Sequence, residues 1–483
     1  MGLPVELQRE IFDHLTGDPG EMVRDFDALS ATCHSLRDVI QEDKLLRRKY
    51  RLVRRLGQAA YACIRDFYLF AGAPDLNATT LPACGALLRL VGPQQREGIV
   101  AAAIGLRDPS LKGQAIARLG AHAAFLNNAQ RARLLAEVFA ITDEVNRARA
   151  ISGLAAGIAS LSAPQREKLV NEALAMTSEE AMAVAIEALG AKATYLNQSA
   201  CEKLLDAAIG MSNDLNRARA LRGASAGVAG LTEHQRERLV AAALAMTNQV
   251  FKAGVIAVLG AHATHLSEAD RDSLLDASLE LTLDTAKAVA IAGLGKGAAN
   301  FSVPQRESMF FAAMGFRLYM DKAKAISGLG TGAAYFSETQ RNAFVTATIG
   351  NPSHSEDISK AYAIAGLAEH AVRLTESQCD ELVTAAIGLA INEAKAIAVG
   401  GLGANSADLS IKQLIRLATA AICITDARAK AIAIGKLGAG MGRLPEALQD
   451  NLVEAAIRID DGYCRAIALA GLVAGMNGIA VPD

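Results

Sequence analysis

Histidine and cysteine are the side chains of this chain best suited to catalysis or to metal binding. His262 and His265 lie close together, but they lack the glutamate and the third ligand that a zinc protease site requires. The seven cysteines are widely separated, which indicates reduced thiols in a cytosolic setting. No glycine-rich phosphate loop and no nucleophile elbow is present. We therefore expect a non-catalytic protein with no metal and no cofactor.

A ladder of basic residues is the most regular chemical pattern. An acidic residue precedes the basic one by three or four positions in most copies, for example Asp108 before Lys112. That spacing allows ion pairs along one helix, so the pattern favours a structural role. The alternative is a surface that binds an acidic protein or a nucleic-acid backbone. The ladder is interrupted at Met182 and consists of Lys112, Arg147, Arg217, Lys252, Lys287, Lys322, Lys360, Lys395, Lys430 and Arg465.

A second column, two residues after the basic one, changes chemistry from copy to copy. Variation at one fixed geometric position is typical of a binding surface on a repeat protein. If the isoleucines near the C-terminus are exposed, they form an apolar patch for a partner; if buried, they belong to the core. The column comprises Gln114, Arg149, Val184, Arg219, Gly254, Val289, Lys324, Tyr362, Ile397, Ile432 and Ile467.

A third set of charges lies in the first half of each copy. An arginine recurs there, and the residue after it is mostly acidic, as in Glu97, Glu237 and Glu307. Because both signs recur at one period, we expect ion pairs between neighbouring copies. The arginines are Arg96, Arg131, Arg166, Arg236, Arg271, Arg306 and Arg341.

These columns exist because the chain repeats itself every 35 residues, with one copy three residues longer. Each copy opens with a helix N-cap, usually Ser, Thr or Asn, and most have Gln or Asp three residues later, which predicts a capping box. About a dozen residues with apolar positions at helical spacing follow, then a polar break and a second such segment. The copies begin at Gly92, Asn127, Ser162, Asn197, Thr232, Ser267, Ser302, Ser337, Thr375, Ser410 and Pro445.

Two features of the second segment predict how the copies assemble. The position of Gly260 is small in nearly every copy, as at Gly120 and Gly330, so we expect neighbouring helices to approach closely there. A single helical hairpin cannot bury its apolar face, whereas stacked hairpins can. The sequence therefore predicts an all-α protein whose residues 92–483 form an α-solenoid of about eleven helical-hairpin repeats.

The first 46 residues have a different pattern. They begin with Leu-Pro-x-Glu, continue with two short amphipathic helices and a Cys-His pair, and end in an Asp-x-x-Leu segment. This order resembles the F-box family, and residues 1–46 are identified as an F-box-like domain. Residues 47–91 are interpreted as linking helices and a degenerate capping repeat. The residues at or near the family's positions are Leu3, Pro4, Glu6, Ile11, Leu15, Leu29, Cys33, His34, Asp43 and Leu46.

The resemblance implies a three-helix fold that docks onto the Skp-type adaptor of a cullin-RING ubiquitin ligase, while the solenoid binds a target protein. The alternative is that residues 1–46 merely cap a repeat scaffold with no ubiquitin role. The adaptor-binding residues implied by the resemblance are Leu3, Pro4, Glu6, Leu7, Ile11, Leu15, Leu29, Cys33, Leu36, Val39 and Leu46.

Composition limits the setting. The 49 basic and 51 acidic residues nearly balance, so no global charge favours nucleic acid or an anionic membrane. No uninterrupted apolar stretch is long enough to span a bilayer. The Ala- and Gly-rich repeats resemble bacterial proteins, which implies a type III-type effector that mimics host F-box proteins. We accordingly expect a monomer before assembly, acting in the cytoplasm or nucleus of a host.

Overall fold

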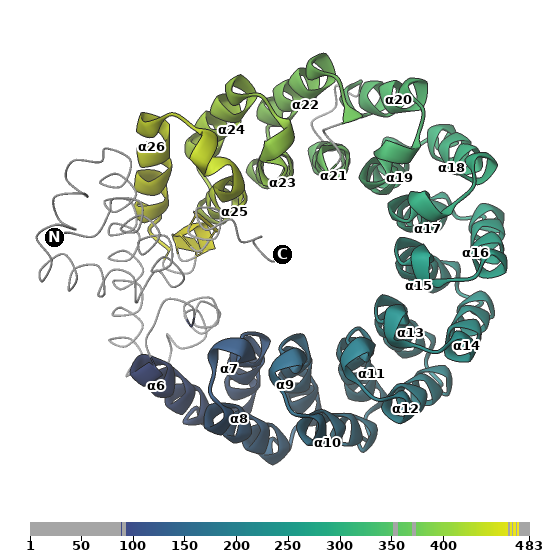
Figure 1. Ribbon diagram of the computed structural model, residues 1–483, viewed down its shortest axis with the longest axis vertical. Helices are drawn as coiled ribbons and strands as arrows, with labels where there is room; N and C mark the ends of the chain where they lie inside the picture. Colours follow the sequence, from purple (N-terminus) through teal and green to yellow (C-terminus); the bar gives the residue numbers. More distant parts are fainter. Residues whose placement is uncertain are drawn as a thin grey trace, which may run out of the picture.

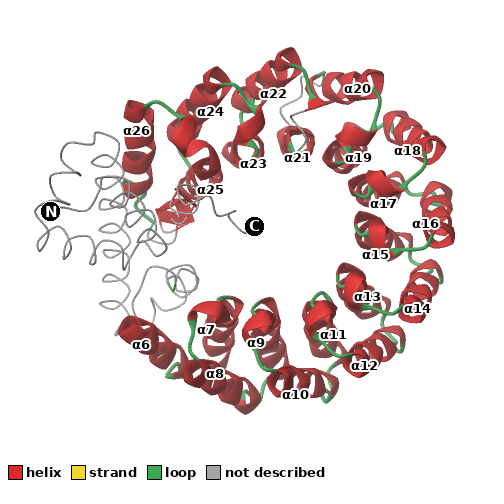
Figure 2. Ribbon diagram, viewed as in Figure 1, coloured by secondary structure: helices red, strands yellow, loops and turns green. Residues whose placement is uncertain are grey.

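The computed structural model describes residues 93–350, 356–369 and 373–461, together with Leu88 and seven residues between 464 and 472. Within these ranges the chain is helical and contains no strand (Figure 2). The N-terminal segment expected to be F-box-like, and residues 351–355 of the longer copy, lie outside the described residues. The described helices form a consecutive two-layer array, so the predicted all-α solenoid is confirmed for this part of the chain.

The array turns through most of a circle, with one layer of helices outside and the other lining the interior (Figure 1). The outer helices are α6 (Pro93–Ile104), α8 (Asn128–Ala140), α10 (Ala163–Leu174), α12 (Gln198–Ile209), α14 (Glu233–Leu244), α16 (Glu268–Glu280), α18 (Val303–Gly315), α20 (Glu338–Ile349), α22 (Glu376–Gly388), α24 (Ile411–Cys423) and α26 (Glu446–Ile457). The inner helices are α7 (Pro109–Ala121), α9 (Glu144–Ala156), α11 (Glu179–Gly190), α13 (Asp214–Ala226), α15 (Gln249–Ala261), α17 (Asp284–Lys296), α19 (Tyr319–Thr331), α21 (Asp357–Ala368), α23 (Asn392–Ala404) and α25 (Ala427–Leu437).

A short 3-10 helix follows most inner helices and returns the chain to the outer layer. These turns were not predicted from the sequence, because three-residue segments leave no periodic signal. They are η1 (Ala123–Phe125), η2 (Ile158–Ser160), η3 (Ala193–Tyr195), η4 (Val228–Gly230), η5 (Ala263–His265), η6 (Ala298–Asn300), η7 (Ala333–Tyr335), η10 (Ser406–Asp408) and η11 (Gly438–Arg443).

The outer helices begin where the predicted N-caps stand. In α14, the Thr232 hydroxyl accepts from the Gln235 N–H, while the Gln235 side chain accepts from the Thr232 N–H at 2.9 Å. The same reciprocal pair forms at Ser302 and at Ser410. Two backbone donors that the first helical turn cannot satisfy are thereby paired, which explains why the layers remain in register with the 35-residue repeat.

The core lies between the two layers. In the repeat that begins at Thr232, the outer helix contributes Leu239 and Val240, and the inner helix contributes Ile256 and Leu259. All four side chains are at most 3% exposed. Burying each contributes roughly 1.5–3 kcal/mol to stability relative to leaving it exposed. Because the same positions recur in every repeat, the core runs continuously around the array.

The array curves because its two layers are spaced differently. A Cβ added at Gly260 would lie 2.8 Å from the Leu294 nitrogen of the next inner helix, so the predicted close approach is confirmed. A second glycine column is tighter, since a Cβ at Gly293 would lie 2.1 Å from Ala257 Cα. The outer helices bury larger side chains, such as Phe344. Small contacts inside and large ones outside place the inner helices on the concave side.

Six arginines of the outer-helix ladder form no ion pair with a described residue of a neighbouring repeat: Arg131, Arg166, Arg236, Arg271, Arg306 and Arg341. Arg271 donates instead to the carbonyl of Leu266 at 2.7 Å, at the end of a 3-10 turn. Arg166 donates to Leu161 O at 2.9 Å and to Tyr195 O at 2.7 Å. These carbonyls have no partner within the turn, so a nearby guanidinium satisfies them. For these arginines the expectation was wrong because it overlooked the 3-10 turns. Ion pairs between neighbouring repeats do form through the acidic column, as between Glu97 and Arg133.

The acidic column does connect neighbouring repeats, but through other partners. Glu97 accepts from the capping-box side chain of Gln130 at 3.0 Å and pairs with Arg133, both in the next repeat. These two contacts lower the pKa of Glu97. Glu202 repeats the arrangement with Gln235 and Arg238. The capping glutamine therefore serves two purposes, since it closes its own helix and binds the preceding one.

Candidate functional site

The inner face of the array is lined by the exposed sides of the inner helices (Figure 1). In α9, Ile151 and Leu154 are buried toward the outer layer, whereas Arg149 lies on the exposed side. The variable column thus lies on the inner face. Its members are exposed at Gln114, Arg149, Lys324 and Tyr362 and half-buried at Val184, Arg219, Gly254, Val289, Ile397, Ile432 and Ile467.

The isoleucines at the C-terminal end of this column fit neither alternative fully. Ile397 and Ile467 are half-buried and pack against the core. Ile432 is also half-buried. One repeat earlier, Tyr362 is 50% exposed. This end of the inner face is therefore apolar but offers a partner only part of each isoleucine.

The basic ladder lies at a different place, between an inner helix and the next outer helix. Lys112 pairs with Glu137 of α8 at 3.1 Å, and Arg147 pairs with Glu172 of α10 at 2.8 Å. The equivalent position in later repeats is alanine, as at Ala277. Among the described residues, no ion pair therefore forms at Lys252, Lys287, Lys322, Lys395 or Lys430.

Carbonyl groups supply part of what stabilises the ladder. Arg217 donates to Met211 O, and Lys360 donates to Ile349 O, each at 3.3 Å. Both oxygens stand at the C-terminal end of an outer helix, where the helix dipole favours a cation. The remaining members, Met182 excepted, occupy the same column of the repeat. The dipole of the inner helix disfavours a cation at its N-terminal end, but the C-terminal end of the neighbouring outer helix stabilises that cation.

Three of the acidic residues expected to pair with the basic ladder have a different role. Asp108, Asp143 and Asp426 each accept a backbone N–H three residues later and so act as helix N-caps. An ion pair does form between residues three positions apart, as between Glu144 and Arg147 at 3.6 Å. At these aspartates the acidic residue begins the helix, and the spacing to the basic residue is a by-product of capping.

Charge is separated between the two layers. The ten inner helices carry 17 basic and nine acidic side chains, a formal charge of +8. The eleven outer helices carry 13 basic and 21 acidic side chains, a formal charge of −8. The balanced total hides this difference between the layers. Nine of the 17 basic side chains belong to the basic ladder, which lies toward the outer layer, so the positive charge of the inner face comes from other cations, such as Arg118 and Arg149.

A groove of about 370 Å³ lies on the inner face across α7, α9 and α11. Its floor is made of small residues, including Ala117, Ser152 and Gly153. Arg118 and Arg149 line it, and no acidic residue does. Both arginines are exposed, and neither pairs with a carboxylate among the described residues. The nearest polar contact of Arg149 is the amide oxygen of Asn146 at 3.3 Å.

The groove ends at the one inner helix that is clearly acidic. Helix α11 carries Glu179, Glu180 and Glu187 and no basic residue. Glu187 lies 3.3 Å from Arg219 and 2.7 Å from Arg222 of α13, so those guanidiniums are neutralised locally. Arg118 and Arg149 have no such partner within the described ranges. The groove is therefore an uncompensated cationic site.

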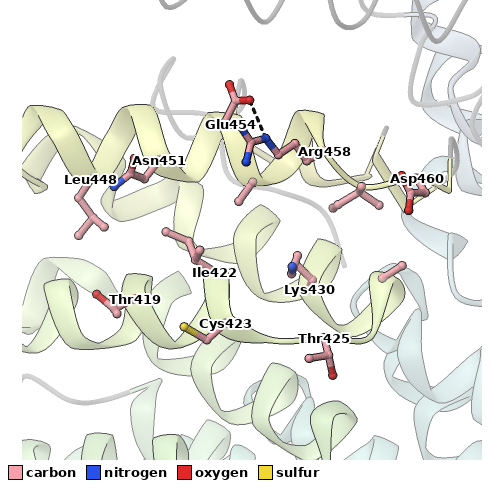
Figure 3. A pocket seen from close by; sticks show the side chains of 13 residues that line it. Thr419, Ile422, Cys423, Thr425, Lys430, Leu448, Asn451, Glu454, Arg458 and Asp460 are labelled. Atoms are coloured by element: carbon pink, nitrogen blue, oxygen red, sulfur yellow. Dashed lines mark hydrogen bonds and ion pairs between the residues drawn. The ribbon is translucent and has the colours of Figure 1, made fainter.

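A larger groove, of about 580 Å³, lies between α24, α25 and α26 (Figure 3). Lys430 and Cys423 line it, as do Glu454 and Arg458, whose side chains pair at 2.9 Å. Asp460 adds a second negative charge. Because both signs are mixed, the groove has no charge preference that would identify a ligand.

The metal-binding and nucleophilic side chains of the described residues are dispersed. Those residues contain no group of three or more His, Cys, Asp or Glu side chains that could hold a metal ion. Burial raises the pKa of the Cys201 thiol, and it raises that of Cys379 to about 11. Protonated thiols are poor nucleophiles. In the same part of the chain, no helix is long and apolar enough to cross a membrane.

Two important residues escaped the sequence analysis. Arg118 belongs to no column, because most repeats have glycine at its position, and most have alanine, serine or glycine at the position of Glu187. The signal that would have found them is the net charge of each predicted helix rather than the recurrence of single positions. The residues of the F-box-like segment, from Leu3 to Leu46, lie outside the described residues. No model of a known protein family matches the chain, and a search of curated proteins finds no match.

Proposed function

We propose that this chain recruits a target protein to a cullin-RING ubiquitin ligase of a host cell, in the manner of a bacterial effector. Residues 1–46 dock onto a Skp-type adaptor, and the solenoid holds the target on its inner face. Ubiquitin transfer is performed by the partners, and the chain contributes binding by raising the local concentration of the target.

The observation that carries the proposal is the ordered F-box-like motif at residues 1–46, ahead of a repeat array that begins at residue 92. The motif begins with Leu3, Pro4 and Glu6 and ends near Leu46. The array supports the second half of the proposal, because a concave inner face with exposed arginines in a groove suits a protein ligand. A solenoid without catalytic groups in its described part fits an adaptor better than an enzyme.

The test is a pull-down of the purified chain with a eukaryotic Skp-type adaptor. Its control is the variant Leu3→Ala/Pro4→Ala, which alters only the motif and leaves the solenoid unchanged. We expect the intact chain to retain the adaptor and the variant to lose it. If the intact chain does not bind, the ubiquitin role is refuted, and residues 1–46 become a cap of a protein-interaction scaffold.

Binding to nucleic acid is a second candidate, favoured by the lysines of the basic ladder that lack an ion pair among the described residues. It predicts that affinity for an oligonucleotide falls steeply as salt rises, because bound counterions are released. The half-buried position of Lys252 and Lys395 and the acidic helix α11 argue against a continuous phosphate track.

A further inference from the structure

We propose that the groove across α7 and α9 binds an acidic, extended segment of the target protein, with carboxylates placed on Arg118 and Arg149. The inference deepens the proposed function, since it rests on the target-binding role of the solenoid. It does not depend on the F-box-like segment.

Charge complementarity is the first argument. Arg118 and Arg149 lie on the inner face of successive repeats and have no carboxylate partner among the described residues. Arg222 and Arg133, by contrast, are exposed arginines that are neutralised by Glu187 and Glu97. Two uncompensated guanidiniums beside one groove favour carboxylates, which arginine binds through two parallel hydrogen bonds.

The shape of the groove is the second argument. Its floor consists of Ala117, Ala121, Gly153 and Ala156, so a main chain can approach the helices closely. Ser152 adds a hydroxyl that can pair with a peptide group. A groove of about 370 Å³ lined by small residues and two arginines suits an extended strand better than a helix, whose diameter is about 10–12 Å with side chains.

The repeat spacing predicts the pattern of the ligand. Packed helices lie about 8–10 Å apart. A polyproline II segment has three residues per turn and rises about 3.1 Å per residue, so its same face recurs about every 9 Å. A segment with an acidic residue at every third position therefore places one carboxylate per repeat.

A polypeptide fits this face better than a nucleic acid. Helix α11 borders the groove and carries Glu179 and Glu180 besides the ion-paired Glu187. Its two other glutamates would disfavour a continuous phosphate backbone, whereas a peptide can place a neutral or basic residue there. Proteins that bind single-stranded nucleic acids combine a positively charged groove with aromatic side chains on which successive bases stack. The ten inner helices contain only three aromatic residues, Phe251, Tyr319 and Tyr362, and none lines the groove.

The experiment measures fluorescence anisotropy with the purified full chain at about 0.1 M salt. The probe is a labelled peptide of about 20 residues with glutamate at every third position, compared with an isomer whose glutamates are clustered at one end. The test variant is Arg118→Gln/Arg149→Gln. The matched control is Lys203→Gln/Lys412→Gln, which removes two exposed charges from outer helices. Circular dichroism confirms that both variants are folded.

We expect the spaced peptide to bind more tightly than the clustered one and the test variant to weaken it about tenfold, with the control within about twofold. Equal losses in both variants, or no binding of the spaced peptide, would overturn the inference. Tighter binding of a single-stranded oligonucleotide would overturn the assignment to a polypeptide. If the peptide behaves as expected while the adaptor pull-down fails, the groove assignment stands and the ubiquitin role alone is refuted.

Discussion

Two glycines in neighbouring inner helices are expected to respond oppositely to the same substitution. In Gly293→Ala the new Cβ would lie 2.1 Å from Ala257 Cα, whereas an ordinary contact begins at 3.4 Å. Helices α15 and α17 must then separate by about 1.3 Å, and such overpacking costs about 1–3 kcal/mol. In Gly254→Ala the Cβ meets only Arg222 Cδ at 3.8 Å, so only the gain in helix propensity of about 0.5–1 kcal/mol remains.

Urea denaturation of the two variants measures this difference. We expect the free energy of unfolding to fall in Gly293→Ala and to rise in Gly254→Ala. If neighbouring inner helices move about 1.3 Å apart while the outer helices stay in contact, each substituted repeat rotates against the next. With the two layers about 9 Å apart, this rotation is roughly 8°. Small-angle scattering of Gly153→Ala/Gly293→Ala/Gly328→Ala should therefore show a more open array. An equal gain in stability at Gly254 and Gly293 would refute close packing of the inner helices as the origin of the curvature.

Three further predictions concern stability and reactivity. Arg271→Ala should lower the free energy of unfolding by about 1–3 kcal/mol, measured in urea, because it leaves the Leu266 carbonyl unpaired. Asp321→Ala should raise it by about 1–2 kcal/mol at neutral pH, since Asp321 is 3% exposed and one carboxylate oxygen has no partner. Burial raises the pKa of Asp321, so its ionised carboxylate destabilises the fold as pH rises through that pKa. If the gain in free energy of unfolding from Asp321→Ala is no larger at pH 7 than near pH 4, this reasoning is contradicted. Cys423 is exposed and Cys201 is buried with a raised pKa, so iodoacetamide followed by peptide mass analysis should modify Cys423 first.

Contacts within one repeat were predictable from the sequence. The caps at Thr232 and Ser302 and the apolar positions of Leu239 and Ile256 depend only on residues a few positions apart. Helix geometry converts such spacings directly into neighbours. The close approach at Gly260 was also predictable, because glycine weakens a helix and recurs within one where a neighbouring backbone leaves no room for a side chain.

Contacts between repeats were not predictable in this way. The partner of Glu97 is Gln130 of the next repeat, and Arg271 binds a carbonyl rather than a carboxylate. Each outcome depends on how far one hairpin is rotated and shifted against the next, which no single spacing encodes. The two columns illustrate the point, since Lys112 of the basic ladder lies against an outer helix while Arg149 of the variable column faces the interior.

The sequence by itself determined the helices, their caps, the repeat and the buried faces, because these follow from short-range geometry. Tertiary structure alone decided the curvature, the separation of charge between inner and outer layers, and the meeting of Arg118 and Arg149 in one groove. The physical reason is that curvature arises from a difference in packing distance between two layers. Small residues such as Gly293 have that effect only when a second helix lies against them.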